Sequence, residues 1–88
     1  MIQSLKALHK IPPGTPFIIY ERFGAPYFEA LVLKRHTAGG LILAPQGALN
    51  SERFFKCDGK SFQMDPKGFA LRTQLGRVAV RFEVNAPA

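Results

Sequence analysis

The sequence predicts a mostly β fold, a small antiparallel barrel or strongly bent sheet of five to six strands with a possible short helix at its start. Two observations lead to this prediction. Short runs rich in aromatic and β-branched residues recur at close spacing, separated by turns that contain Gly or Pro. Several of these runs are apolar on both faces, and a chain of 88 residues buries such strands in a barrel or a bent two-layer sheet.

The first ten residues fit one short helix. Ile2, Leu5 and Leu8 recur at a spacing of three, which places them on one side of a helical turn. A helix this short is unstable alone, so we expect it to lay these side chains on the rest of the fold. Pro12, Pro13 and Gly14 follow it and stop it.

The next segment predicts three strands. Residues 15–22 are dense in aromatic and β-branched side chains, and residues 23–26 form a turn. Residues 27–37 form a long strand that is apolar on both faces in its middle, as in a central strand or one that curls across a barrel. Residues 41–44 form a short strand that ends at Pro45.

Residues 51–65 predict a hairpin. Asp58 and Gly59 stand between two Phe-containing runs, and Asp-Gly is favoured at the centre of a two-residue type I′ turn. A hairpin closed there predicts three pairs on its inward face: Cys57 with Lys60, Phe55 with Phe62, and Arg53 with Met64. The outer face carries Phe54 beside Lys56.

The last part of the chain predicts a turn and a strand. Residues 65–68 match a type I turn, with Pro second and Gly fourth. Residues 69–75 are weakly patterned and fit either a strand or one helical turn. Residues 77–84 alternate strictly, with Val78, Val80, Phe82 and Val84 inward and Arg77, Ala79, Arg81 and Glu83 outward.

We therefore expect one domain over residues 1–88, with the helix at 1–10, the barrel at 15–84 and a tail at 85–88. In architecture the pattern resembles Src-homology-3-like, Sm-like and Tudor-like barrels. The signature residues of the Sm family are not recognisable, and neither is an acidic groove bearing Trp, because the chain has no Trp.

The charge predicts acidic partners. Twelve Lys and Arg against six Asp and Glu give a net charge of +6, which favours nucleic acid, an anionic surface or an acidic protein. Cys57 is the only cysteine, so no disulfide forms within the chain, and a reducing cytoplasm fits. Because no run approaches a spanning helix and no signal peptide is recognisable, we expect no membrane partner.

The sequence favours a binding protein over an enzyme. The acidic residues are scattered and the two His are far apart, and no phosphate loop, nucleophile elbow or metal-ligand spacing occurs. We therefore expect no catalytic residue, metal, cofactor or small-molecule substrate.

Basic and aromatic residues are the candidate site. If the hairpin and the last strand are neighbours, Phe54, Lys56, Arg77 and Arg81 form an aromatic floor ringed by cations, which suits single-stranded nucleic acid bound with low sequence specificity. Lys34 and Arg35, at the end of the long strand, are further candidates. Two alternatives remain. Phe54 packs under the N-terminal helix or a loop, or the same patch or the free strand edges serve a protein partner or a homo-oligomer.

Overall fold

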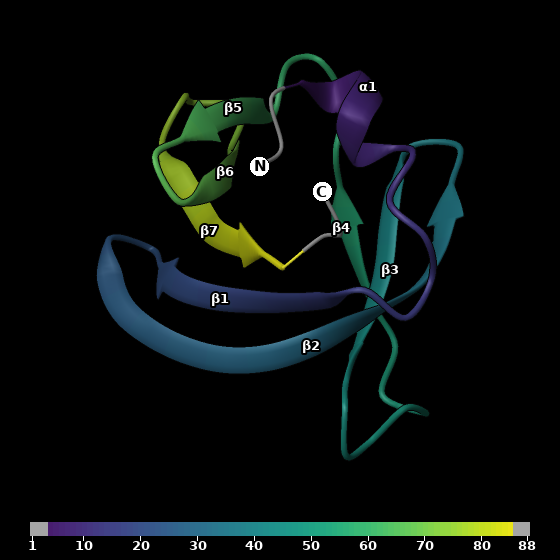
Figure 1. Ribbon diagram of the computed structural model, residues 1–88. Helices are drawn as coiled ribbons and strands as arrows, with labels where there is room; N and C mark the ends of the chain where they lie inside the picture. Colours follow the sequence, from purple (N-terminus) through teal and green to yellow (C-terminus); the bar gives the residue numbers. More distant parts are fainter. Residues whose placement is uncertain (1–3, 86–88) are drawn as a thin grey trace.

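A computed structural model describes residues 4–85 and shows one antiparallel sheet of seven strands, curved into a half-barrel, with one short helix (Figure 1). The elements are α1 (Leu5–Leu8), β1 (Pro16–Arg22), β2 (Ala25–Thr37), β3 (Gly40–Pro45), β4 (Arg53–Lys56), β5 (Phe62–Asp65), β6 (Gly68–Arg72) and β7 (Val78–Val84). The mostly β prediction is confirmed. The strand count is higher than expected because the weakly patterned residues 69–75 contain most of β6.

The strand order is β4-β3-β2-β1-β7-β6-β5. The long strand β2 lies inside the sheet, where it pairs with β1 along its first part and with β3 along its second. Of the two apolar faces predicted for it, that of Leu31 and Leu33 is buried, whereas Phe28 and Ala30 on the other are exposed. The last strand, β7, lies between β1 and β6. Within residues 4–85, no helix is long and apolar enough to cross a membrane.

The short helix is present, although it ends earlier than Pro12. The Ser4 side chain caps it by accepting a hydrogen bond of 3.1 Å from the Ala7 backbone N–H. Leu8 is fully buried and Leu5 packs against the core, as the spacing predicted. Ile2 lies outside the described residues, as do the last three residues of the expected tail.

The expected hairpin at residues 51–65 is wrong. β4 and β5 stand at opposite ends of the sheet order and do not pair. Neither Asp58 nor Gly59 has the positive φ that a type I′ turn needs. Instead, the Asp58 carboxylate accepts hydrogen bonds of 2.9 Å from the backbone N–H groups of Lys60 and Ser61. This local turn is a corner that carries the chain from one end of the sheet order to the other.

The type I′ turn occurs at the β1–β2 connection. Phe23 has φ 52° and Gly24 has φ 81°, and they join the paired residues Arg22 and Ala25. Positive φ at both central positions identifies this turn type, which favours Asn-Gly rather than Phe-Gly. The turn predicted at residues 65–68 is confirmed, since Asp65 pairs with Gly68 to close the β5–β6 hairpin.

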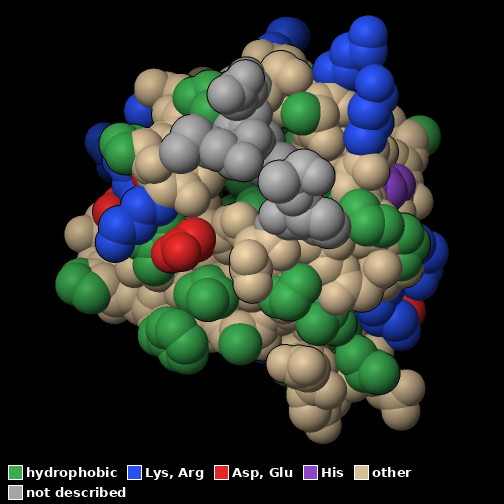
Figure 2. Space-filling model, in the orientation of Figure 1, with side chains coloured by type: hydrophobic (Ala, Val, Ile, Leu, Met, Phe, Trp, Pro, Cys, Tyr) green, Lys and Arg blue, Asp and Glu red, His purple; other side chains and the backbone are tan. Residues whose placement is uncertain are grey.

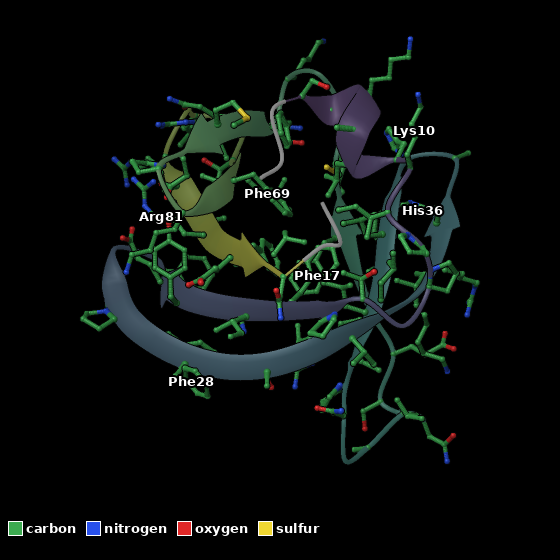
Figure 3. The ribbon with its side chains drawn as sticks, in the orientation of Figure 1. Lys10, Phe17, Phe28, His36, Phe69 and Arg81 are labelled. Atoms are coloured by element: carbon green, nitrogen blue, oxygen red, sulfur yellow. The ribbon has the colours of Figure 1, made fainter. Side chains whose placement is uncertain are left out.

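Aromatic rings form the middle of the core. The Phe82 ring stacks on Phe69 at 4.9 Å between ring centres and meets the edge of Phe17 at 6.1 Å. Phe17 and Phe69 point into the half-barrel, whereas Phe28 points away from it (Figure 3). The alternation predicted for the last strand is right from Val80 onward, where Val80 and Phe82 are buried and Val84 packs on the core. It is wrong at Ala79, which was expected to face outward and instead packs half-buried against the core, next to the point where the pairing with β6 shifts register.

The inward patch predicted from residues 55–64 is right in part. Cys57 is buried in the core, and Phe55 and Phe62 are half-buried against it. Met64 is exposed, contrary to expectation, because β5 ends the sheet order and lacks a neighbouring strand on one side to cover it.

Candidate nucleic-acid interface

The predicted cations do not form one patch. On the face shown in Figure 2, Lys and Arg side chains lie in separate groups at the left, the right and the upper right. β4, which carries Phe54 and Lys56, is not a neighbour of β7, which carries Arg81. The pairing that would have joined the four residues is therefore absent from the sheet.

Lys34 and Arg35 share one carboxylate. The Lys34 ammonium lies 2.8 Å from Glu52, and the Arg35 guanidinium donates two hydrogen bonds to Glu52 at 2.9 and 3.1 Å. Hydrogen bonds from Arg35 and then Lys34 lower the pKa of Glu52 to about 2. This pairing ties the loop after β3 to β2 and leaves these two cations with a net charge of one.

Arg81 is held between two carboxylates. Its guanidinium lies 3.0 Å from Glu21 and also contacts Asp65, which is only 7% exposed (Figure 3). Burial alone would raise the pKa of Asp65, but hydrogen bonds from the Tyr20 hydroxyl and the Lys67 backbone N–H, with the Arg81 charge, lower it. Burial, followed by the bond to Asp65, raises the pKa of Tyr20 to about 12. Arg81 therefore joins β7 to β1 and β5.

Phe54 and Lys56 lie side by side on the outer face of β4. They are two residues apart in a strand, so their side chains project on the same side about 7 Å apart. Phe54 is 56% exposed, and therefore it does not pack under α1 or a loop. The Lys56 ammonium makes only a long contact with Asp58, at 3.6 Å, so most of its surface remains available.

An open hollow of about 430 Å³ lies beside Lys56. We call it the basic hollow, and its lining residues are Lys56, Asp58, Lys60, Ser61, Arg72, Thr73, Gln74 and Gly76. Three of these side chains are cationic and one is a carboxylate. One oxygen of the Asp58 carboxylate accepts from the backbone N–H groups of Ser61 and Lys60, which lower its pKa, and the other faces the Lys56 ammonium. The hollow therefore presents mainly hydrogen-bond donors and positive charge.

The guanidinium of Arg72 is fixed in the basic hollow. Its Nε donates to the Gln63 side chain and one terminal nitrogen donates to the Gly76 carbonyl. The other terminal nitrogen has no hydrogen-bond acceptor in the part of the chain that the structure describes. A guanidinium held in this way has donors left for a phosphate at no further cost in side-chain order.

Arg77 follows the basic hollow directly. Gly76 has φ 80° and lies in a tight loop that two backbone hydrogen bonds close. The Thr73 N–H donates to the Arg77 carbonyl at 2.8 Å, and the Gly76 N–H donates to the Thr73 carbonyl at 2.9 Å. The exposed Arg77 is thus the residue directly after the last lining residue of the hollow. Of the six predicted site residues, Lys56 lines the hollow, Arg77 follows the lining residue Gly76, and Phe54 lies two residues before Lys56.

Lys60 and Arg72 were missed by the sequence prediction. Lys60 was assigned to the inward face of a hairpin that does not form, and Arg72 belongs to a segment whose conformation the pattern left open. The Asp-Gly-Lys-Ser run, in which Asp58 accepts from the backbone, is the signal that could have placed Lys60 on an exposed corner.

A second group of exposed side chains lies at the β1–β2 turn. The Arg22 guanidinium stands 5.6 Å from the centre of the Phe23 ring and 5.7 Å from that of Tyr27. We call Arg22, Phe23 and Tyr27 the aromatic tip. Phe23 is 72% exposed, and its left-handed backbone costs about 1–2 kcal/mol relative to glycine.

The aromatic tip and the basic hollow lie at the same end of the sheet. The Phe23 backbone N–H donates a hydrogen bond of 3.1 Å to the Ala79 carbonyl near the start of β7. Arg72, at the end of β6, pairs with Val78 at the start of the same strand. The tip is therefore two strand spacings from Arg72, about 10 Å. None of the three tip residues is among the site residues predicted from the sequence.

The described residues also show whether metal-ligating side chains gather at either place. Within residues 4–85, no three side chains of His, Cys, Asp and Glu converge to hold a metal ion. Cys57 is buried in the core, and burial followed by the nearby Asp58 charge raises the pKa of its thiol to about 12. No protein-family model, curated protein or solved structure matches the chain.

Proposed function

We propose that the protein binds nucleic acid through phosphate contacts in the basic hollow, with low sequence specificity. The observation that carries this proposal is the convergence of Lys56, Lys60 and Arg72 on one open hollow. The Thr73 hydroxyl adds a donor of the kind that contacts phosphate and sugar, whereas the Ser61 hydroxyl already donates to the Lys56 and Asp58 carbonyl oxygens. The site offers no array of groups set to read the edges of bases, which is the reason for expecting low specificity.

The distribution of paired charges supports this choice of site. Five cations are engaged by carboxylates, which leaves seven of the twelve without a carboxylate partner among the described residues. Lys60, Arg72, Arg77 and Arg22 are four of those seven, and all belong to the end of the sheet that holds the hollow and the tip. The net charge of +6 is therefore expressed most strongly there.

The test is a pair of matched charge changes. Lys56→Gln with Lys60→Gln removes two charges from the hollow, and Lys6→Gln with Lys10→Gln removes two from exposed positions in and after α1. We expect only the first pair to weaken binding of labelled 20-nucleotide strands, measured by fluorescence anisotropy at about 50 and 200 mM salt. Loss of two phosphate contacts should also reduce the slope of log affinity against log salt by about 1.4 to 1.8.

Two outcomes would contradict the proposal. Equal weakening by both pairs would mean that the overall field of the molecule, and not the hollow, attracts the strand. No binding by the unaltered protein at low salt would remove nucleic acid as the ligand.

The alternative is a protein partner or a homo-oligomer that uses the same hollow or the end strands of the sheet. The observation that favours it is the sheet order, which ends at the two four-residue strands β4 and β5. Light scattering after size-exclusion chromatography on the same samples would reveal a stable oligomer. A monomer that binds nucleic acid in the anisotropy assay would count against this alternative.

A further inference from the structure

The residue at the first central position of the β1–β2 turn is unfavourable for its backbone conformation. A type I′ turn prefers Asn, Asp or Gly there, and a bulky side chain at φ 52° is uncommon. The Phe23 ring is 72% exposed, so burial in the core does not offset the strain. A ring kept in such a position contributes to something other than the fold.

The contacts of Phe23 present one side of its ring to solvent. The Arg22 guanidinium stands over the ring at 5.6 Å and over the Tyr27 ring at 5.7 Å, so one cation lies between two aromatic side chains. Aromatic rings beside an arginine are the groups on which unpaired bases stack, while the arginine neutralises a phosphate.

The position of the aromatic tip fits the path of a strand that occupies the basic hollow. The Phe23 backbone N–H is hydrogen-bonded to the Ala79 carbonyl, and the adjacent residue Val78 pairs with Arg72, which lines the hollow. Arg77 belongs to the loop between them. A single strand whose phosphates contact Lys60 and Arg72 would therefore run past Arg77 and reach the aromatic tip.

We propose that the protein prefers single-stranded nucleic acid and that one unpaired base stacks on Phe23. This inference rests on the proposed phosphate binding in the basic hollow. Charge complementarity favours a polyanion as the ligand, and the exposed ring favours a single strand over a duplex. A base in a duplex is already stacked on both faces, whereas an unpaired base has faces free to stack on an aromatic side chain.

The decisive variant is Phe23→Asn. Asn is favoured in the type I′ turn, so the change removes the ring while relieving the backbone. We expect a melting temperature at or above that of the unaltered protein. We also expect affinity for a single-stranded 20-mer about tenfold weaker or more, and unchanged affinity for a duplex of the same length. The matched control is Phe28→Thr, which removes a 75% exposed ring from β2 outside the tip and should leave both affinities unchanged.

A fluorescence measurement gives an independent readout. The chain contains no Trp, so Phe23→Trp places a single reporter at the aromatic tip. We expect its emission to be quenched on titration with the single strand and not with the duplex, because a base stacked on the indole ring quenches its emission.

Each remaining outcome separates this inference from the proposed function. If Phe23→Asn binds the single strand normally while Lys56→Gln with Lys60→Gln weakens it, stacking at the tip is wrong and phosphate binding stands. Equal affinity for single strand and duplex would also overturn the inference. A Trp signal that responds to anionic phospholipid vesicles, in a protein that binds no nucleic acid, would overturn both and indicate a membrane surface.

Discussion

At the scale of single residues, six of the eight phenylalanines fall into two distinct environments. Phe17, Phe69 and Phe82 are fully buried and contact one another edge-on or stacked. Phe23, Phe28 and Phe54 are each more than half exposed. Alternation in a strand predicts which face a ring occupies, but it does not predict whether a neighbouring strand covers that face.

The central ring of the core should be the most costly to remove. Phe82→Ala deletes the side chain that stacks on Phe69 and meets Phe17, and we expect a loss of about 3–5 kcal/mol in the free energy of unfolding. Phe54→Ala removes an exposed ring and should change it by less than about 0.5 kcal/mol. Urea denaturation of the three proteins measures both values. Similar losses for the two variants would show that the core is not centred on Phe82.

At the scale of elements, two strand pairs are held close by glycine. A Cβ added to Gly40 would lie 2.1 Å from the Phe55 carbonyl oxygen across the β3–β4 pair. A Cβ added to Gly68 would lie 2.2 Å from the Phe82 carbonyl oxygen across β6–β7. Both obstacles are backbone atoms, so the strands themselves would have to separate.

Adjacent glycines provide a matched test of this packing. We expect Gly40→Ala to destabilise the protein by about 1–3 kcal/mol or more, because β4 must shift to admit the methyl group. Gly39→Ala meets no atom within 4 Å and should be nearly neutral. Thermal melting of both variants distinguishes them. A neutral Gly40→Ala would mean that β4 can move away from β3 freely.

The elements at the ends of the sheet order depart most from the sequence prediction. The Asp-Gly pair after β4 favours a hairpin locally, yet the Asp58 carboxylate satisfies the backbone N–H groups of a corner instead. In the folded protein β4 pairs with β3 and β5 pairs with β6, so the two strands do not pair with each other. A two-residue signal cannot reveal that each strand has another partner.

At the scale of the whole molecule, paired carboxylates couple stability to pH. The pKa of Glu52 is lowered to about 2 by Arg35 and Lys34, and that of Asp65 is also lowered in the fold. A carboxyl group with a lowered pKa in the folded state contributes stability above its unfolded pKa, near 4. That contribution is lost as the pH falls and the folded carboxyl is protonated.

We therefore expect the melting temperature to fall between about pH 4 and pH 2, where these carboxylates take up protons. In Asp65→Asn, position 65 no longer titrates, so the melting temperature should start lower at pH 6 and decline less steeply. Melting curves at four values of pH from 6 to 2 measure both slopes. Parallel decline in the two proteins would show that Asp65 does not contribute to acid sensitivity.

The sequence alone determined the mostly β class, the presence of a short helix before the first strand, most strand positions, the alternation of most of the last strand and the excess of positive charge. These properties depend on local periodicity, turn chemistry and composition, which neighbours in the chain settle. Only the tertiary structure decided that Arg81 forms ion pairs with Glu21 and Asp65. It also decided that Lys60 and Arg72 line the same hollow as Lys56. Closing a curved sheet sets the order of its strands through contacts far apart in the sequence, and this order decides which charges are neutralised and which stay available.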